Sequence, residues 1–110
     1  MNRTIRTLAV LLLLSLGLYA AGPKDQTLTG TVSDTMCGAR HTMMPGKPDA
    51  DCVRACVKAN IDYALVVGTK VYTVKGNTGD LDKFAGQKAA VTGKVSGDVI
   101  QATSVAAPKK

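Results

Sequence analysis

The segment YALVVGTKVYTVK, residues 63–75, carries the clearest structural signal in the chain. Residues 63–67 and 70–75 are rich in β-branched and aromatic side chains, and Gly68 and Thr69 separate the two runs. Two such runs joined by two residues that include glycine are typical of a β-hairpin. The sequence therefore predicts a pair of antiparallel strands in the middle of the chain.

Three further segments have the alternation of a half-buried strand. Residues 26–34 place Leu28 and Val32 on one face and threonines on the other, and residues 88–96 alternate in the same way. A turn at residues 97–98 precedes a last strand over residues 99–105. Five strands predict a mainly β, OB-like Greek-key barrel, with Gly30 and Gly93 at tight bends. The alternative is an open sheet packed on a helix over residues 49–60.

Two helical insertions interrupt the strands, one after the first strand and one before the fourth. Asp49 is a candidate N-cap for the helix over residues 49–60, in which Cys52 and Cys56 lie on one stripe and Asn60 accepts the left-handed ending. Asp80 is a candidate cap for a single helical turn over residues 81–85.

The N-terminus is typical of a secretory signal peptide over residues 1–21. Arg3 and Arg6 precede an apolar run over residues 8–18, and small residues follow it. A membrane anchor is the alternative, but a spanning helix needs roughly 20 apolar residues. We therefore expect a periplasmic or secreted protein with no membrane association after cleavage. Residues 22–107 then form one barrel domain, and residues 108–110 form a disordered tail.

The charge pattern gives no sign of a nucleic-acid partner. The formal net charge of +6 falls to +4 when Arg3 and Arg6 leave with the signal peptide, and the remaining basic residues are scattered singly. We therefore expect a monomer whose partners are a metal ion and an unidentified envelope protein or small ligand.

One cluster of residues carries the chemistry: Cys37, His41, Cys52 and Cys56. The cluster contains every cysteine and the only histidine of the chain within 20 positions. Residues four apart on a helix lie on one face, so Cys52 and Cys56 can present two thiolates together. The preceding loop can add the other two residues, which gives a Cys3His set, and this set is common in structural zinc sites. The sequence thus predicts a metal-binding protein, with zinc favoured.

Copper is the alternative metal, because Met36, Met43 and Met44 flank Cys37 and His41. Thioethers and thiolates are soft ligands that favour Cu(I). The same methionines could instead fill gaps in an apolar loop. Asp34, at the end of the first strand, either begins the turn or orients His41 through a hydrogen bond.

A disulfide is the main alternative to a metal. Thiols of exported proteins usually pair, and a bridge from Cys37 to Cys52 or Cys56 would leave one free thiol in a stapled ligand-binding or adaptor module. A bridge between Cys52 and Cys56 is disfavoured, because both side chains point the same way on one helix face. A thiol redox protein is a third class. Because no catalytic constellation stands out, we expect a protein that is not an enzyme.

Three segments resemble a group of small, exported, largely uncharacterised bacterial proteins with an OB-like fold. The similar segments are residues 30–38 (GTVSDTMCG), residues 63–74 and residues 84–95 (FAGQKAAVTGKV). The first segment continues to His41 and the Cys52/Cys56 pair, which together give the motif D-x-x-C-G…H…C-x3-C. The similarity covers nearly all of the chain after the signal peptide. It implies export and the barrel fold, and it implies no activity.

Overall fold

A computed structural model describes residues 25–40 and 46–109, and the predicted signal peptide, residues 1–21, lies outside them. The elements, in chain order, are β1 (Asp25–Asp34), α2 (Asp49–Lys58), β2 (Tyr63–Val67), β3 (Lys70–Lys75), α3 (Thr78–Lys83), β4 (Lys88–Ser96) and β5 (Val99–Ala106). The predicted β-rich chain with two helical insertions is confirmed.

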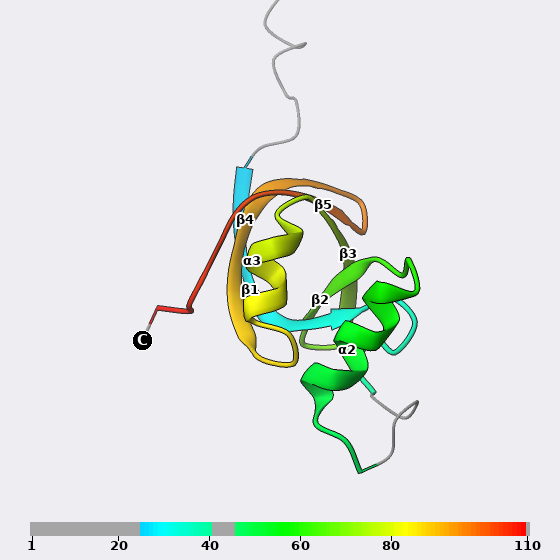
Figure 1. Cartoon of the computed structure of the whole chain (residues 1–110). Helices are drawn as coiled ribbons and strands as arrows, with labels where there is room; N and C mark the ends of the chain where they lie inside the picture. Colours follow the sequence, from blue (N-terminus) through cyan, green and yellow to red (C-terminus); the bar gives the residue numbers. More distant parts are fainter. Residues whose placement is uncertain (1–24, 41–45, 110) are drawn as a thin grey trace, which may run out of the picture.

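Hydrogen bonds close the five strands into a barrel with the order β1-β2-β3-β5-β4, in which β4 pairs again with β1. All neighbouring strands are antiparallel except β3 and β5, which run parallel (Figure 1). The predicted five-stranded barrel is therefore confirmed, and the alternative of an open sheet is wrong. Closing the sheet leaves neither a free β1 edge nor a free β4 edge.

The central hairpin has the predicted bounds. Tyr63 pairs with Val74 and Val67 pairs with Lys70, so that Gly68 and Thr69 alone form the connection. Gly68 has a φ of +61°, a left-handed conformation that glycine adopts without steric cost. The local sequence pattern is enough to predict this hairpin, because a two-residue connection fixes the register of both strands.

Two strand glycines lie where backbones approach too closely for a side chain. β1 pairs with β4 over residues 25–31 and with β2 over residues 31–34, and Gly30 lies at this changeover. A Cβ atom at Gly30 would overlap the backbone carbonyl of Val66, and one at Gly93 would overlap the carbonyl of Gln101. The pairing of β4 with β5 is irregular at Gly93 as well. These close approaches are the reason that glycine occupies both positions, and the tight bends expected there stay a prediction.

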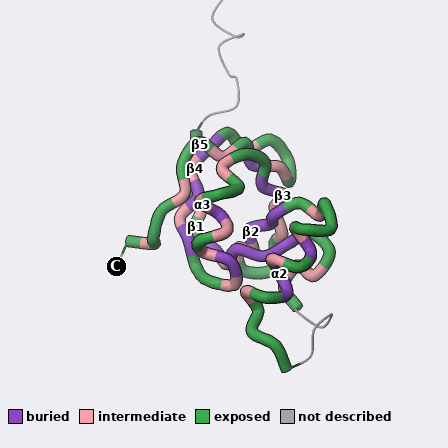
Figure 2. Tube along the Cα trace, in the orientation of Figure 1, coloured by how far each residue is buried: buried purple, intermediate pink, exposed green. Residues whose placement is uncertain are grey.

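The core fills the barrel and extends under the two helices, as the buried segments in Figure 2 show. Val32, Leu65, Val91 and Ile100 from the strands are completely buried, and so is Leu81 of α3. The three aromatic residues in the described part of the chain belong to this core too: Tyr63 is buried, and Tyr72 and Phe84 pack against it. These three side chains are therefore part of the packing rather than an exposed platform for stacked bases.

Both helices begin earlier than predicted, α2 at Asp49 and α3 at Thr78. The N-cap of α2 is Pro48 and that of α3 is Asn77, and neither makes a side-chain capping bond. The backbone carbonyl of Pro48 accepts from Cys52 N at 3.4 Å, and that of Asn77 accepts from Leu81 N at 2.9 Å. Asp49 and Asp80 therefore lie inside the first turns, and their predicted roles as N-caps are wrong. There their negative charge still favours the positive end of the helix dipole.

The sequence predicts the C-terminal end of α2 better than its start. The helix ends at Lys58, and Asn60 has a φ of +67°, the left-handed conformation expected of it. The last turn is closed by backbone bonds, including one from Asn60 N to the carbonyl of Val57 at 3.0 Å. No helix within residues 25–40 and 46–109 is both long and apolar enough to cross a membrane.

Candidate metal centre

Two of the three cysteines lie on the buried face of α2. Cys52 is 1% exposed and Cys56 is 8% exposed, and Val53 beside them is part of the core. Because four residues separate the cysteines on one helix, both side chains reach the same side of it. The predicted presentation of two sulfurs from one helix face is therefore confirmed.

The third cysteine, Cys37, belongs to the turn that follows β1. Asp34 builds this turn: its Oδ1 accepts hydrogen bonds from Met36 N at 3.0 Å and from Cys37 N at 2.7 Å. The backbone carbonyl of Asp34 accepts a further bond from Gly38 N at 2.8 Å. Asp34 therefore begins the turn, which was one of its two predicted roles, and the turn fixes Cys37 against α2.

The three sulfur atoms lie within 4.8 Å of one another. Cys37 Sγ is 3.4 Å from Cys52 Sγ and 3.9 Å from Cys56 Sγ. Two ligands at about 2.3 Å from a tetrahedral zinc ion are separated by about 3.8 Å. The cluster thus has the size of a metal site, and these three cysteines could hold an ion.

The remaining predicted ligand cannot be compared with this geometry. His41, Met43 and Met44 lie outside the described residues. Met36 is described, and its side chain is 56% exposed, so it fills no gap in the core. The second predicted role of Asp34, orienting His41, lies outside the described residues as well.

The cysteines are free thiols in this structure. The shortest separation, 3.4 Å between Cys37 and Cys52, is longer than the roughly 2.05 Å of a disulfide bond. Cys56 Sγ is only slightly farther from Cys37 Sγ, at 3.9 Å. Both predicted disulfide pairings, Cys37 with Cys52 and Cys37 with Cys56, therefore stay alternatives to a metal, and either would leave one free thiol.

The environment of Cys37 and Cys56 favours their protonated forms. Burial raises the pKa of Cys37 to about 12, and hydrogen bonds among the three sulfurs and the charge of Asp34 act in the same direction. Burial also raises the pKa of Cys56, and the negative charge of Asp34 adds to this effect, while the hydrogen bond with Cys37 opposes it. Because the thiolate is the nucleophile, raised pKa values make these cysteines poor catalysts of thiol exchange.

Sequence reasoning missed one feature of this site. Asp34 is completely buried, and its second carboxylate oxygen, Oδ2, has no hydrogen-bond partner among the described residues. Buried carboxylate oxygens are normally paired, because removing a charge from water is costly. The alternating pattern of β1 gave no signal for this burial, which depends on the closure of the barrel and on α2.

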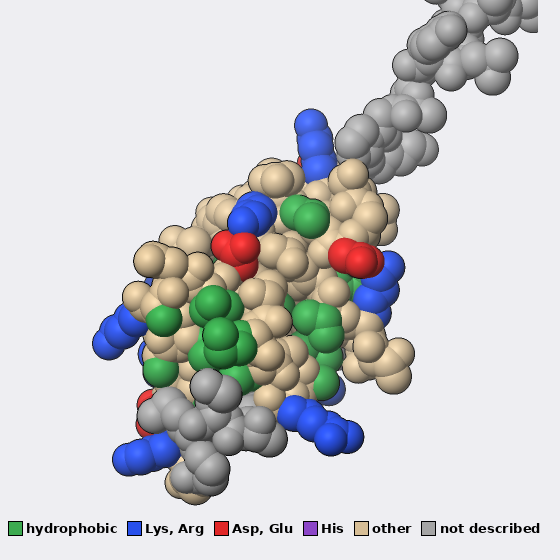
Figure 3. All heavy atoms as spheres, turned by 90° about the vertical axis from the view of Figure 1, so that its right-hand side faces the viewer, with side chains coloured by type: hydrophobic (Ala, Val, Ile, Leu, Met, Phe, Trp, Pro, Cys, Tyr) green, Lys and Arg blue, Asp and Glu red, His purple; other side chains and the backbone are tan. Residues whose placement is uncertain are grey.

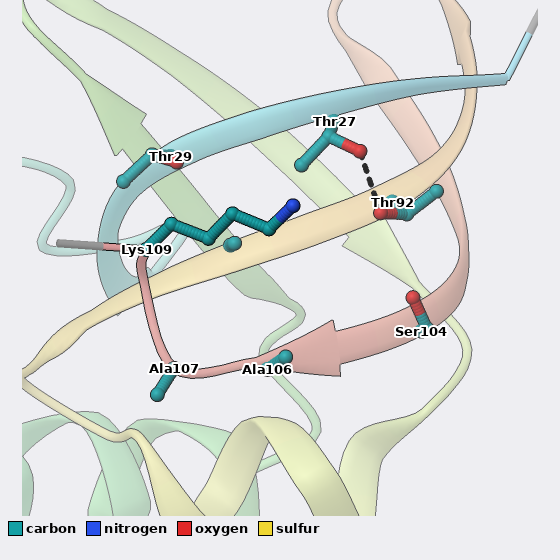
Figure 4. A pocket seen from close by; sticks show the side chains of 8 residues that line it. Thr27, Thr29, Thr92, Ser104, Ala106, Ala107 and Lys109 are labelled. Atoms are coloured by element: carbon teal, nitrogen blue, oxygen red, sulfur yellow. Dashed lines mark hydrogen bonds between the residues drawn. The ribbon is translucent and has the colours of Figure 1, made fainter.

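Away from the cysteines, a groove of about 420 Å³ lies on the β1, β4 and β5 side of the barrel. It is lined by Thr27, Thr29, Ala90, Thr92, Ser104, Ala106, Ala107 and Lys109. The Thr27 and Thr92 hydroxyls hydrogen-bond to each other at 2.8 Å, and the Lys109 side chain extends along the groove (Figure 4). The groove offers hydroxyl groups and one ammonium, and its lining includes no histidine or carboxylate that could activate them as nucleophiles.

Basic side chains do not gather on the face shown in Figure 3. Lysine and arginine side chains are spread around its rim, and acidic side chains lie between them. Among the described basic residues, Arg54, Lys70, Lys75 and Lys83 form ion pairs with aspartates. This face therefore lacks the continuous basic stripe that nucleic-acid binding requires.

Comparison with protein-family models, with curated proteins and with solved structures found no match. The resemblance to small exported OB-like proteins therefore stays a prediction. What can be said about function rests on the geometry of the chain itself.

Proposed function

We propose that this chain is an exported metal-binding protein whose ligands include Cys37, Cys52 and Cys56. The observation that carries the proposal is the convergence of three sulfurs within 4.8 Å, two from α2 and one from the turn after β1. Such a set of soft donors is typical of a site for zinc or Cu(I).

Zinc is the favoured ion. The predicted fourth ligand is His41, which would complete a Cys3His set of the kind found in structural zinc sites. Zinc has no redox chemistry, so it would also protect three thiols from oxidation in the periplasm or outside the cell, where the predicted signal peptide would direct the chain. Copper remains the alternative, and its support is the exposed thioether of Met36 next to Cys37.

The bound ion would act structurally. It would join α2 to the end of β1, two elements whose cysteines are 15 and 19 residues apart in the sequence. Metal binding to such a site contributes directly to folding, because the unfolded chain does not preform the ligand set. Two raised cysteine pKa values oppose the thiol redox alternative, and we propose no enzymatic role.

The test combines metal analysis with a count of thiols. Protein purified from the periplasm under anaerobic conditions should contain one metal ion per chain and three thiols that react after denaturation. A protein stapled by a disulfide from Cys37 to Cys52 or Cys56 would contain no metal and one reactive thiol. That second result would overturn the proposal.

A matched pair of variants assigns the site. Cys56→Ser removes a buried sulfur and should abolish stoichiometric metal binding. Ala55→Ser places the same side chain at the neighbouring exposed position of α2 and should leave binding unchanged. Stoichiometric metal in Cys56→Ser would exclude Cys56 from the ligand set.

A further inference from the structure

The buried carboxylate of Asp34 is the feature of the molecule that the three-cysteine site does not yet explain. Its Oδ1 is occupied by two backbone N–H groups, and its Oδ2 is buried without a partner among the described residues. The residue is 0% exposed. A turn needs only one side-chain oxygen, which asparagine also supplies and serine supplies more weakly. The turn therefore explains the side-chain oxygen of Asp34 but not its buried negative charge.

The charge of Asp34 acts on the sulfur cluster. Its Oδ1 accepts a hydrogen bond from Cys37 N at 2.7 Å, so the carboxylate lies in the same turn as one of the three sulfurs. The raised pKa values of Cys37 and Cys56 agree with this placement. The two N–H groups that point at Oδ1 stabilise the ionised form. When a metal displaces the thiol protons, the cluster therefore gathers three thiolates and one carboxylate in a poorly hydrated space.

We propose that Asp34 determines the charge preference of the site and favours a divalent ion such as Zn(II) over monovalent Cu(I). The inference rests on the proposed metal-binding function and names the residue that selects the ion. Attraction between the carboxylate and the ion is proportional to the charge of the ion, so a divalent ion gains twice as much as a monovalent one.

The repulsion between the carboxylate and the thiolates is the same whichever ion is bound. It therefore cancels when the affinities for the two ions are divided, and the ratio isolates the attraction between Asp34 and the metal. A residue that merely shapes the turn would change both affinities by the same factor. The ratio of affinities thus separates selection of the ion from a structural role.

The experiment measures affinities for Zn(II) and Cu(I) by competition with a chromophoric chelator under anaerobic, reducing conditions. Asp34→Asn removes the charge and keeps an oxygen that can accept the two N–H bonds, and Asp34→Ser does the same with a hydroxyl. Asp98→Asn is the control, because it removes the same charge from an exposed side chain that pairs with Lys70.

We expect both Asp34 variants to shift the ratio of Zn(II) affinity to Cu(I) affinity about tenfold towards copper, because only the attraction to the ion differs between the two metals. The control should leave the ratio unchanged. An equal change for both ions, or loss of all binding in both variants, would assign Asp34 to the turn alone and overturn the inference. If the unmodified protein binds neither ion, the proposed function itself fails, and that result is distinct.

Discussion

The pH dependence of zinc binding can be worked out from the cysteine environment. Burial raises the pKa of Cys37 to about 12, and the pKa of Cys56 is raised above its usual value of 9.0. Both thiols therefore hold their protons near neutral pH. Zinc binds thiolates, so at least these two protons must leave when an ion enters the cluster.

The direction and the size of the change in zinc affinity with pH follow from the number of protons released. Each released proton makes the binding constant rise about tenfold per pH unit, so two protons predict a rise of at least about 100-fold per unit. Affinity increases as the pH rises, and acidification releases the ion. The rise should persist over the whole interval below the thiol pKa values, with no plateau near neutrality.

Competition with a chromophoric chelator, corrected for the chelator's own protonation, measures this slope between about pH 6 and about pH 8. Replacing Cys37 with serine should lower the slope by one proton as well as the affinity, whereas Ala55→Ser should alter neither. A slope clearly below two protons per ion would refute the reasoning. It would mean that the thiols were already ionised before the metal arrived.

Three further outcomes follow from the fold. Leu65→Ala should lower the free energy of unfolding by about 2–5 kcal/mol in urea titration, since the side chain is completely buried in the barrel. Gly93→Ala should also destabilise the barrel, because the new Cβ meets the Gln101 carbonyl, whereas Gly79→Ala meets nothing within 4 Å and should not destabilise it. The free energy of unfolding of the metal-free protein should fall progressively from about pH 9 to about pH 12, because the Cys37 thiol ionises at a lower pH in the unfolded chain than in the folded one. Chemical denaturation of the metal-free protein would measure this fall. A constant free energy of unfolding over that interval would contradict the prediction.

The strands could be predicted because their signals are local. The hairpin of β2 and β3 needs only alternation and a two-residue connection, and both are written in consecutive residues. The helix starts could not be predicted in the same way, since Pro48 and Asn77 supply backbone carbonyls rather than capping side chains. Nothing in the sequence pattern distinguishes a first-turn aspartate from an N-cap aspartate when no capping bond forms.

In the metal centre, too, the features that depend on local sequence could be predicted and the feature that depends on tertiary structure could not. The pairing of Cys52 with Cys56 follows from helical spacing alone, and the addition of Cys37 was inferred from its position in the chain. The unpartnered oxygen of Asp34 has no counterpart in the local pattern. It exists because β1 ends inside the molecule, where α2 and the barrel together exclude water from the carboxylate. Burial of this kind is a tertiary property.

The way in which α2 is attached limits what an ion can do for the fold. Val53 is part of the core, and Arg54 binds Asp82 of the α3 helix through its Nε at 3.1 Å, while its Nη2 donates to the Asp82 carbonyl at 3.0 Å. These contacts hold α2 independently of the sulfurs. A metal would therefore add its main constraint where these contacts are absent, at the turn that carries Cys37, whose side chain is only partly buried. The ion would thus order the turn after β1 more than it would dock the helix, which is consistent with a carboxylate placed in that same turn to attract it.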